Sequence, residues 1–273
     1  MKRPFIKWMG GKTRVMDALK HHLPEGDVFI EPFVGGGSVF LNTDYPEYIL
    51  ADSNPDLIQL MEVAANQPAL LIQQAKVLFE KGEQDDYLKT RQSFNTAEAE
   101  PYVRAAMFLY LNRHGYNGLC RYNAAGGYNV PYGRHPSPPY LPEREILEFA
   151  DKVKRGKVTF LCADFQDTVA LAQQQNNRKV VVYADPPYVP SSKTSSFTQY
   201  HKRDFGQPQH RQLASSLLAA NEHGAKVVLS NSDTLLTREI YHGFTFHTVE
   251  VGRHMAANKD KRGKVTEVIA TLF

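Results

Sequence analysis

The strongest constraint on this chain is a short apolar run that ends on an acid and two prolines. Val180-Val181-Val182-Tyr183-Ala184 is typical of a buried strand in a parallel sheet. Asp185-Pro186-Pro187-Tyr188 follows directly, at the sheet edge where such folds bind ligands. Each proline fixes its own φ, and the residue before a proline is held in extended geometry. The sequence therefore predicts a stiff turn that presents a carboxylate, backbone carbonyls and an aromatic ring to one small space.

Such a turn suits an exocyclic amine on a planar base. The carboxylate of Asp185 and a proline-region carbonyl can accept the two N–H bonds of the amine, while Tyr188 stacks on the ring. An ordinary turn that closes a strand can have the same four residues, so the motif alone leaves both interpretations open. The rest of the chain decides between them.

Strand and helix patterns alternate over most of the chain, which predicts a doubly wound α/β domain. From about residue 58 to 150 the alternation stops, and helices around 68–80 and 100–112 are joined to a loop rich in Gly, Pro and Tyr. We therefore expect a catalytic domain made of residues 1–57 and 151–273, and an inserted, mostly helical domain at residues 58–150. The predicted strands lie at 27–31, 48–52, 157–161, 180–184 and 225–230, with two closing strands, possibly an antiparallel pair, at 246–251 and 265–272.

Composition limits where the protein can be located and which kinds of site it can contain. The chain has 273 residues and only two cysteines, Cys120 and Cys162, which make neither a disulfide framework nor a metal site. No apolar run is long enough to span a membrane, and the N-terminus shows no cleavable apolar segment. We expect a cytoplasmic protein with no metal and no membrane partner.

Residues 101–142 form a local exception to the mixed charge of the chain. The segment contains no Asp or Glu, but it contains four arginines and seven tyrosines. Arg and Asn read guanine and adenine edges, and tyrosines stack on exposed bases. The bias favours contact with nucleic acid over a solvated surface.

Two further motifs indicate a nucleoside ligand. Phe33-Val34-Gly35-Gly36-Gly37 follows a predicted strand and opens a helix, and Asp52 ends the next strand, where a ribose diol is commonly held. The loop lacks the usual dinucleotide spacing, and a flavin, a nucleotide or a purely structural glycine turn remains open from the loop alone. Lys7-Trp8-Met9-Gly10-Gly11-Lys12 lacks the spacing of a phosphate-binding loop. Lys12 could instead pair with a ligand carboxylate while Trp8 packs on a ligand, or the motif could be an edge-packing Trp with two solvated lysines.

Together these motifs resemble the amino-methyltransferases that use S-adenosylmethionine on DNA. Their order resembles the alpha group, in which the insertion is the target recognition domain of a Rossmann-like methyltransferase. The resemblance is closer to the Dam family of DNA adenine-N6 methyltransferases. It is carried by Phe108–Asn123, by Asn129–Arg134 and by the N-terminal motif Lys7–Lys12.

The resemblance implies roles for individual residues. S-adenosylmethionine is the implied cofactor, and the catalytic turn is Asp185, Pro186, Pro187 and Tyr188. The residues implied to bind the cofactor are Trp8, Lys12, Phe33, Gly35, Gly37, Asp52, Asp164, Phe165 and Asp185.

The implied partner is double-stranded DNA with the site GATC, bound by a monomer. Lys7 would reach a guanine, Arg121 would read a guanine edge, and Leu119 would contact a thymine methyl. Tyr116 would insert where the flipped adenine left the stack, and Asn117 would hold phosphate. The same surface would include Arg113, Asn123, Arg134 and His135.

Two alternatives remain beside this expectation. One is an enzyme of the same chemistry with a different DNA or RNA target, and the other is a non-catalytic DNA-binding relative. A cytosine-C5 enzyme is excluded, because neither cysteine follows a proline in a nucleophile loop.

Overall fold

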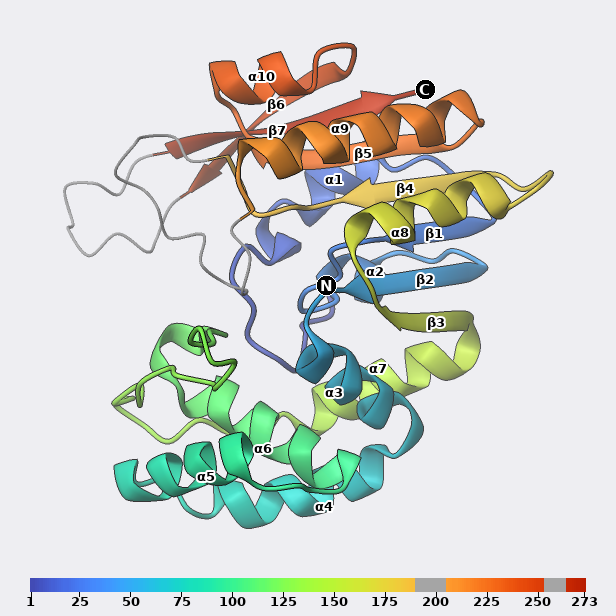
Figure 1. The fold of residues 1–273 in the computed structure, drawn as a ribbon. Coiled ribbons are helices and arrows are strands. Elements are labelled where there is room, and N and C mark those ends of the chain that lie inside the picture. The colour runs from blue at the N-terminus through green and yellow to red at the C-terminus, as the bar shows by residue number, and fades with distance from the viewer. Residues whose placement is uncertain (190–204, 253–263) are drawn as a thin grey trace.

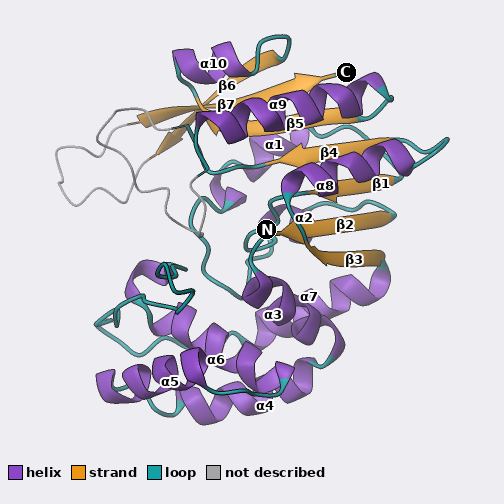
Figure 2. Ribbon diagram, in the orientation of Figure 1, coloured by secondary structure: helices purple, strands orange, loops and turns teal. Residues whose placement is uncertain are grey.

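The computed structural model describes residues 1–189, 205–252 and 264–273, and the side chains of residues 251, 252, 264 and 265 are not described. Helices cover both faces of a central sheet, and a separate group of helices lies beside the β3 edge (Figure 1). Strands are confined to the sheet, and the group beside it is helical (Figure 2). This arrangement confirms the predicted α/β class with a mostly helical insertion.

The sheet has seven strands in the order β3-β2-β1-β4-β5-β7-β6. β1 to β5 are parallel, while β7 is antiparallel to both β5 and β6, as predicted for the closing pair. The strands are β1 (Val28–Glu31), β2 (Glu47–Asp52), β3 (Lys157–Cys162), β4 (Val180–Ala184), β5 (Lys226–Ser232), β6 (Thr245–Gly252) and β7 (Lys264–Leu272).

The central strands β1 and β4 are buried on both faces, and successive side chains point to opposite sides. Phe29 and Tyr183 belong to one core, and Val28 and Val182 belong to the other. The first core is covered by α1 (Met16–His22), α2 (Ser38–Asn42), α3 (Pro55–Asn66) and α7 (Glu143–Arg155). The second is covered by α8 (Phe165–Ala170), α9 (Gln207–Glu222) and α10 (Leu235–Ile240), and short 3-10 turns lie at Lys12–Arg14, Tyr116–Gly118 and Leu171–Gln174.

The inserted region is built on α4 (Pro68–Phe79), α5 (Gln84–Thr96) and α6 (Pro101–His114). α4 and α6 confirm the two predicted helices, whereas α5 and α7 were not predicted. The core of these helices is continuous with the core on the α3 side of the sheet. The predicted domain boundaries, 57/58 and 150/151, lie inside α3 and α7, so no break in secondary structure marks them. The division into two domains at these positions stays a prediction.

The sheet order brings the predicted motifs to one edge. β2, β1 and β4 are neighbours and parallel, so Asp52, the glycine loop after Glu31, and Asp185 all follow the same end of the sheet. Within the described ranges, no helix is long and apolar enough to cross a membrane.

Candidate active site

The Asp-Pro-Pro-Tyr turn and the N-terminal lysine meet at the end of β4. Nζ of Lys12 lies 2.7 Å from Oδ2 of Asp185 and 2.6 Å from the carbonyl oxygen of Gly10. The same ammonium lies 4.9 Å from the centre of the Tyr188 ring. The carboxylate and the ring therefore face one space, as predicted, and a nitrogen with several N–H bonds fits between them.

The exit of the turn is fixed by side chains from the neighbouring strands. The hydroxyl of Tyr188 donates to Oε2 of Glu267 on β7, at 2.8 Å. The amide of Val189 donates to Oδ1 of Asn231, at 3.1 Å, and the hydroxyl of Ser232 donates to the Val189 carbonyl, at 2.8 Å. These three bonds hold the Tyr188 ring in place, which preorganises the site.

Two carboxyl groups in this space are incompletely paired: Glu31 is buried, and Asp185 is partly buried. Burial raises the pKa of Asp185 to about 6, although the Lys12 ammonium acts to lower it. Burial, and then the charge of Asp185, raises the pKa of Glu31 well above its usual range. Oδ1 of Asp185 and Oε2 of Glu31 are buried atoms with no hydrogen-bond partner among the described residues. Such orphaned oxygens indicate that a ligand supplies the missing donors.

The glycine loop is shaped by Trp8 and Asp52. Gly35 has a left-handed φ of +48°, and a Cβ added there would lie 2.7 Å from Cδ1 of Trp8. The Gly35 amide donates to Oδ2 of Asp52, at 3.2 Å, which ties the loop to the end of β2. Gly37 is also left-handed, with a φ of +73°. The loop therefore requires glycine where the backbone approaches both the indole ring and the neighbouring strand.

Aromatic rings line the next part of the edge. The rings of Phe33 and Phe165 are stacked with their centres 5.7 Å apart, and Phe205 lies edge-on to both. Asp164 is exposed, and its side chain caps α8 by accepting from the amide of Gln166 at 3.0 Å. These flat apolar surfaces suit a planar heterocycle.

The residues at this edge of the sheet are of the kinds that suit a nucleoside cofactor such as S-adenosylmethionine. They combine a glycine loop packed on an indole ring, aromatic surfaces, and carboxylates that could accept from an amine and a ribose. Among the described residues, no group of His, Cys, Asp and Glu side chains is arranged to hold a metal ion.

The N-terminal motif joins this edge to the helical region. The amide and carbonyl of Lys7 both bond to the side chain of Asn112 on α6, at 2.9 Å and 2.8 Å. Nζ of Lys7 donates to the carbonyl of Arg113, at 3.2 Å, and its stem packs on Gly118. Burial, and then the charge of Arg113, lowers the pKa of Lys7.

The predicted DNA-contacting residues differ in exposure. Tyr116 is 50 % exposed at the start of a 3-10 turn, and Asn117 beside it is exposed, with a left-handed φ of +54°. Arg121 and Asn123 are exposed, and Nε of Arg121 donates to Oδ1 of Asn129, at 2.8 Å. These side chains lie where a duplex could reach them.

The remaining residues predicted to contact DNA are less exposed or have a left-handed backbone conformation. Arg113 is only 7 % exposed, and its guanidinium lies 4.5 Å from the centre of the Tyr140 ring. His135 is half-buried against Gly133, Leu119 is half-buried, and Arg134 is exposed with a left-handed φ of +46°. Direct contact of DNA with Arg113 would require Tyr140 to move, and all these roles stay predictions.

Several site residues were not predicted from the sequence. Glu31 ends β1 one residue before Pro32, and its position at a strand end was the available signal. Asn231 and Glu267 come from strands far away in the sequence, so no local pattern marks them. Phe205 completes the aromatic cluster, but a single Phe before a helix carries no specific signal.

The sheet with its antiparallel β7, the glycine loop and the Asp-Pro-Pro-Tyr turn agree with a Rossmann-like methyltransferase fold. Comparison with known proteins is more specific. The model of the D12 class N6 adenine-specific DNA methyltransferases matches residues 8–255. The chain belongs to this family.

Curated relatives agree along nearly the full length. The DNA adenine methylase of Escherichia coli (strain K12) is 45 % identical over 270 residues, which cover 98 % of this chain and 94 % of the relative. The DNA adenine methylase of Serratia marcescens is 45 % identical over 271 residues, covering 98 % and 97 %. That of Vibrio cholerae serotype O1 (strain ATCC 39315 / El Tor Inaba N16961) is 43 % identical over 272 residues, covering 98 % and 95 %.

Proposed function

We propose that this protein transfers a methyl group from S-adenosylmethionine to N6 of adenine in double-stranded DNA, within GATC. The observation that carries the proposal is the buried, unpaired Oδ1 of Asp185 beside the fixed ring of Tyr188. A flipped adenine would place its amine against this oxygen and its ring on the tyrosine.

The position of Lys12 supports this use of the site. Its ammonium is a nitrogen with several N–H bonds, and it donates to Asp185 while lying over Tyr188. An adenine amine would meet the same carboxylate and the same ring. Lys12 occupies Oδ2 of Asp185, so the amine would take Oδ1.

The chain's own contribution to the chemistry is positioning and electrostatics. The N6 lone pair is delocalised into the ring, which makes it a poor nucleophile. Hydrogen bonds from N6–H to Asp185 and to the Pro186 carbonyl would favour a pyramidal nitrogen with its lone pair turned out of the ring plane. S-adenosylmethionine, when bound, supplies a methyl group on a positively charged sulfur. Trp8, Asp52, Phe33 and the glycine loop would hold that cofactor, and the surplus proton could leave after transfer.

A base inside a duplex must be extruded before it can reach the turn, at a cost of a few kcal/mol. The exposed ring of Tyr116 is available to fill the space that the base leaves. Stacking of such a ring in the helix would offset part of the cost of extrusion.

The assignment of GATC rests on the family resemblance and on the relatives named DNA adenine methylase. Arg121 would read a guanine edge, Leu119 would contact a thymine methyl, and Lys7 would reach a second guanine. Because Arg121 is exposed and Nε is held by Asn129, its guanidinium is both accessible and oriented. The bacterial sources of the relatives favour action on DNA in the cytoplasm. We expect a single copy of the chain to act.

The proposal is tested by transfer of a radiolabelled methyl group to matched substrates. We expect labelling of a duplex with one GATC, weak labelling of duplexes with one base pair of that site replaced, and none of an RNA duplex. Equal labelling of the changed DNA duplexes would assign a different DNA target, and labelling of the RNA duplex would assign an RNA target. No labelling of any nucleic acid would favour a DNA-binding protein without activity.

A further inference from the structure

The loop after β2 contacts both the cofactor edge and the recognition segment, defined here as residues 119–123. Asp52 accepts from the Gly35 amide through Oδ2 and from the Asn54 amide through Oδ1, at 3.2 Å and 3.0 Å. Two residues further on, Nδ2 of Asn54 donates to Sγ of Cys120, at 3.3 Å. A single short loop therefore joins the glycine loop to the segment predicted to read bases.

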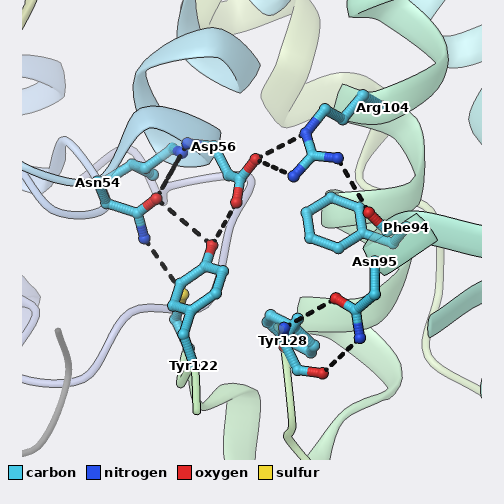
Figure 3. A network of polar contacts seen from close by, with 9 residues as sticks. Asn54, Asp56, Phe94, Asn95, Arg104, Tyr122 and Tyr128 are labelled. Atoms are coloured by element: carbon cyan, nitrogen blue, oxygen red, sulfur yellow. Dashed lines mark hydrogen bonds and ion pairs between the residues drawn. The ribbon is translucent and has the colours of Figure 1, made fainter. Parts of the chain in front are cut away.

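A second branch of this network ends on Tyr122 (Figure 3). The hydroxyl of Tyr122 donates to Oδ2 of Asp56, at 2.6 Å, and lies 3.5 Å from Oδ1 of Asn54. Oδ1 of Asp56 accepts a hydrogen bond from Nε of Arg104 and forms an ion pair with Nη2, both at 2.8 Å. Arg104 occupies one carboxylate oxygen and Tyr122 the other, and Asp56 is only 7 % exposed.

The helix start beneath this network is rigid. Oδ1 of Asn54 caps α3 by accepting from the amides of Asp56 and Leu57, at 3.0 Å and 3.2 Å. The ring of Phe94 lies 4.1 Å from the Arg104 guanidinium, whose Nη1 donates to the Phe94 carbonyl at 2.9 Å. Tyr122 is therefore anchored to a cap and an ion pair, both of which are held by other elements.

Inward and outward side chains alternate along the recognition segment. Cys120 is 4 % exposed and Tyr122 is half-buried, and both bond to the α3 start. Arg121 and Asn123 are exposed, and Leu119 is half-buried. Because successive side chains of an extended chain point to opposite sides, anchoring Cys120 and Tyr122 fixes the direction of the side chains between and beside them.

We infer that Tyr122 is a positioning residue for target recognition: its bond to Asp56 fixes the backbone of the recognition segment, from which Arg121, held by Asn129, faces the base edge. The inference rests on the proposed function, since it requires Arg121 to read a base. Tyr122 touches neither the catalytic turn nor the glycine loop directly and reaches the cofactor edge only through Asn54, so its effect falls mainly on discrimination between sites and changes cofactor affinity little.

The test compares two matched substitutions of tyrosine by phenylalanine. Tyr122→Phe keeps the ring and removes the hydrogen bond to the buried carboxylate. Tyr45→Phe is the control, because its hydroxyl donates to the Pro24 carbonyl at 2.6 Å and lies outside both the catalytic turn and the recognition segment. The readout is the ratio of kcat/KM for a GATC duplex to kcat/KM for duplexes in which either outer G·C pair is replaced by A·T.

We expect Tyr122→Phe to lower this ratio about tenfold at the pair read by Arg121, since a hydrogen bond to a charged acceptor has that order of effect. Tyr45→Phe should leave the ratio unchanged. Cofactor Kd should stay within about twofold of wild type in both. An unchanged ratio in Tyr122→Phe, or an equal fall in Tyr45→Phe, would overturn the inference.

A double substitution separates positioning from a general loss of order. In an Arg121→Ala background the pair is no longer read by Arg121, so Tyr122→Phe should cause no further loss of discrimination there. A further tenfold loss would overturn the inference. If Tyr122→Phe does not fold, Cys120→Ala removes the parallel anchor and should lower the same ratio. A wild-type protein that does not discriminate between the duplexes would refute the proposed function instead.

Discussion

Replacing Gly35 by alanine should damage cofactor binding more than it damages the fold. Gly35 has a left-handed φ of +48°, and an added Cβ would lie 2.7 Å from Cδ1 and 2.8 Å from Nε1 of Trp8. Both distances are shorter than real Cβ contacts, so the indole ring must shift. Trp8 is the only tryptophan in the chain, so its fluorescence reports this shift directly.

Two costs add in this variant. Alanine in a left-handed conformation costs about 1–2 kcal/mol. Moving the Trp8 ring off its preferred rotamer costs about 0.5–1.5 kcal/mol more. Gly224 provides a matched control, because its φ is +91° but nothing lies within 4 Å of an added Cβ. Gly224→Ala should therefore lose only the cost of the left-handed conformation, about 1–2 kcal/mol of stability.

The assay is denaturant unfolding together with titration of S-adenosylmethionine, followed by Trp8 fluorescence and by calorimetry. We expect both variants to lose stability, but only Gly35→Ala to change Trp8 emission. Because the cofactor needs the ring in its native place, the ring-displacement cost of about 0.5–1.5 kcal/mol should weaken cofactor binding by Gly35→Ala about 2- to 13-fold. Wild-type affinity in Gly35→Ala, or equal loss of affinity in Gly224→Ala, would refute the assignment of this loop to the cofactor.

Three further predictions concern the turn and the DNA surface. Since burial raises the pKa of Asp185 to about 6, its acceptor carboxylate is lost as pH falls through that value, so kcat/KM should fall about tenfold per pH unit below about 6; a pH–rate profile that stays flat well below 6 would contradict this role. Arg121→Ala should reduce discrimination against a replaced G·C pair by about 1–3 kcal/mol, measured as a ratio of kcat/KM, and unchanged discrimination would exclude it as the reading residue. Tyr116→Ala should reduce the fluorescence rise of a 2-aminopurine placed at the target adenine, because nothing then fills the vacated stack, and an undiminished rise would contradict that role.

The sequence predicted the sheet well because its signals are local. The β-branched run before Asp185 and the apolar runs after Asp27 and before Asp52 each form a strand within one or two residues of the expected ends. Parallel neighbours then bring their carboxyl ends together, so Asp52, the glycine loop and Asp185 were correctly expected at one edge.

The helical region was harder to predict. α5 is polar and buries only Tyr87 and Phe94 as it packs on α6, so its apolar period is faint. α7 has Glu143 and Glu145 in its first turn and basic residues in its last turn, which is typical of the two ends of a helix. Its start was hidden by the preceding loop rich in Gly, Pro and Tyr.

The sequence predicted only those parts of the site that consist of motif residues. Lys12 was expected to pair with a ligand carboxylate, whereas it pairs with Asp185 of the same chain, and this ion pair joins two motifs that lie far apart in the sequence. Glu267 and Asn231 reach the turn through strand pairing, which no local pattern encodes. Burial of Arg113 could not be seen either, because its cover, Tyr140, lies on a distant part of the loop.

The central claim is that Asp185 accepts the amine of a target adenine in DNA. The most direct measurement is methyl transfer to a duplex with one GATC, followed by digestion to nucleosides, for wild type and for Asp185→Asn. We expect wild type to yield N6-methyladenine from that site alone. The variant should still bind duplex but yield no detectable product. Product on another base, or undiminished product from Asp185→Asn, would contradict the account.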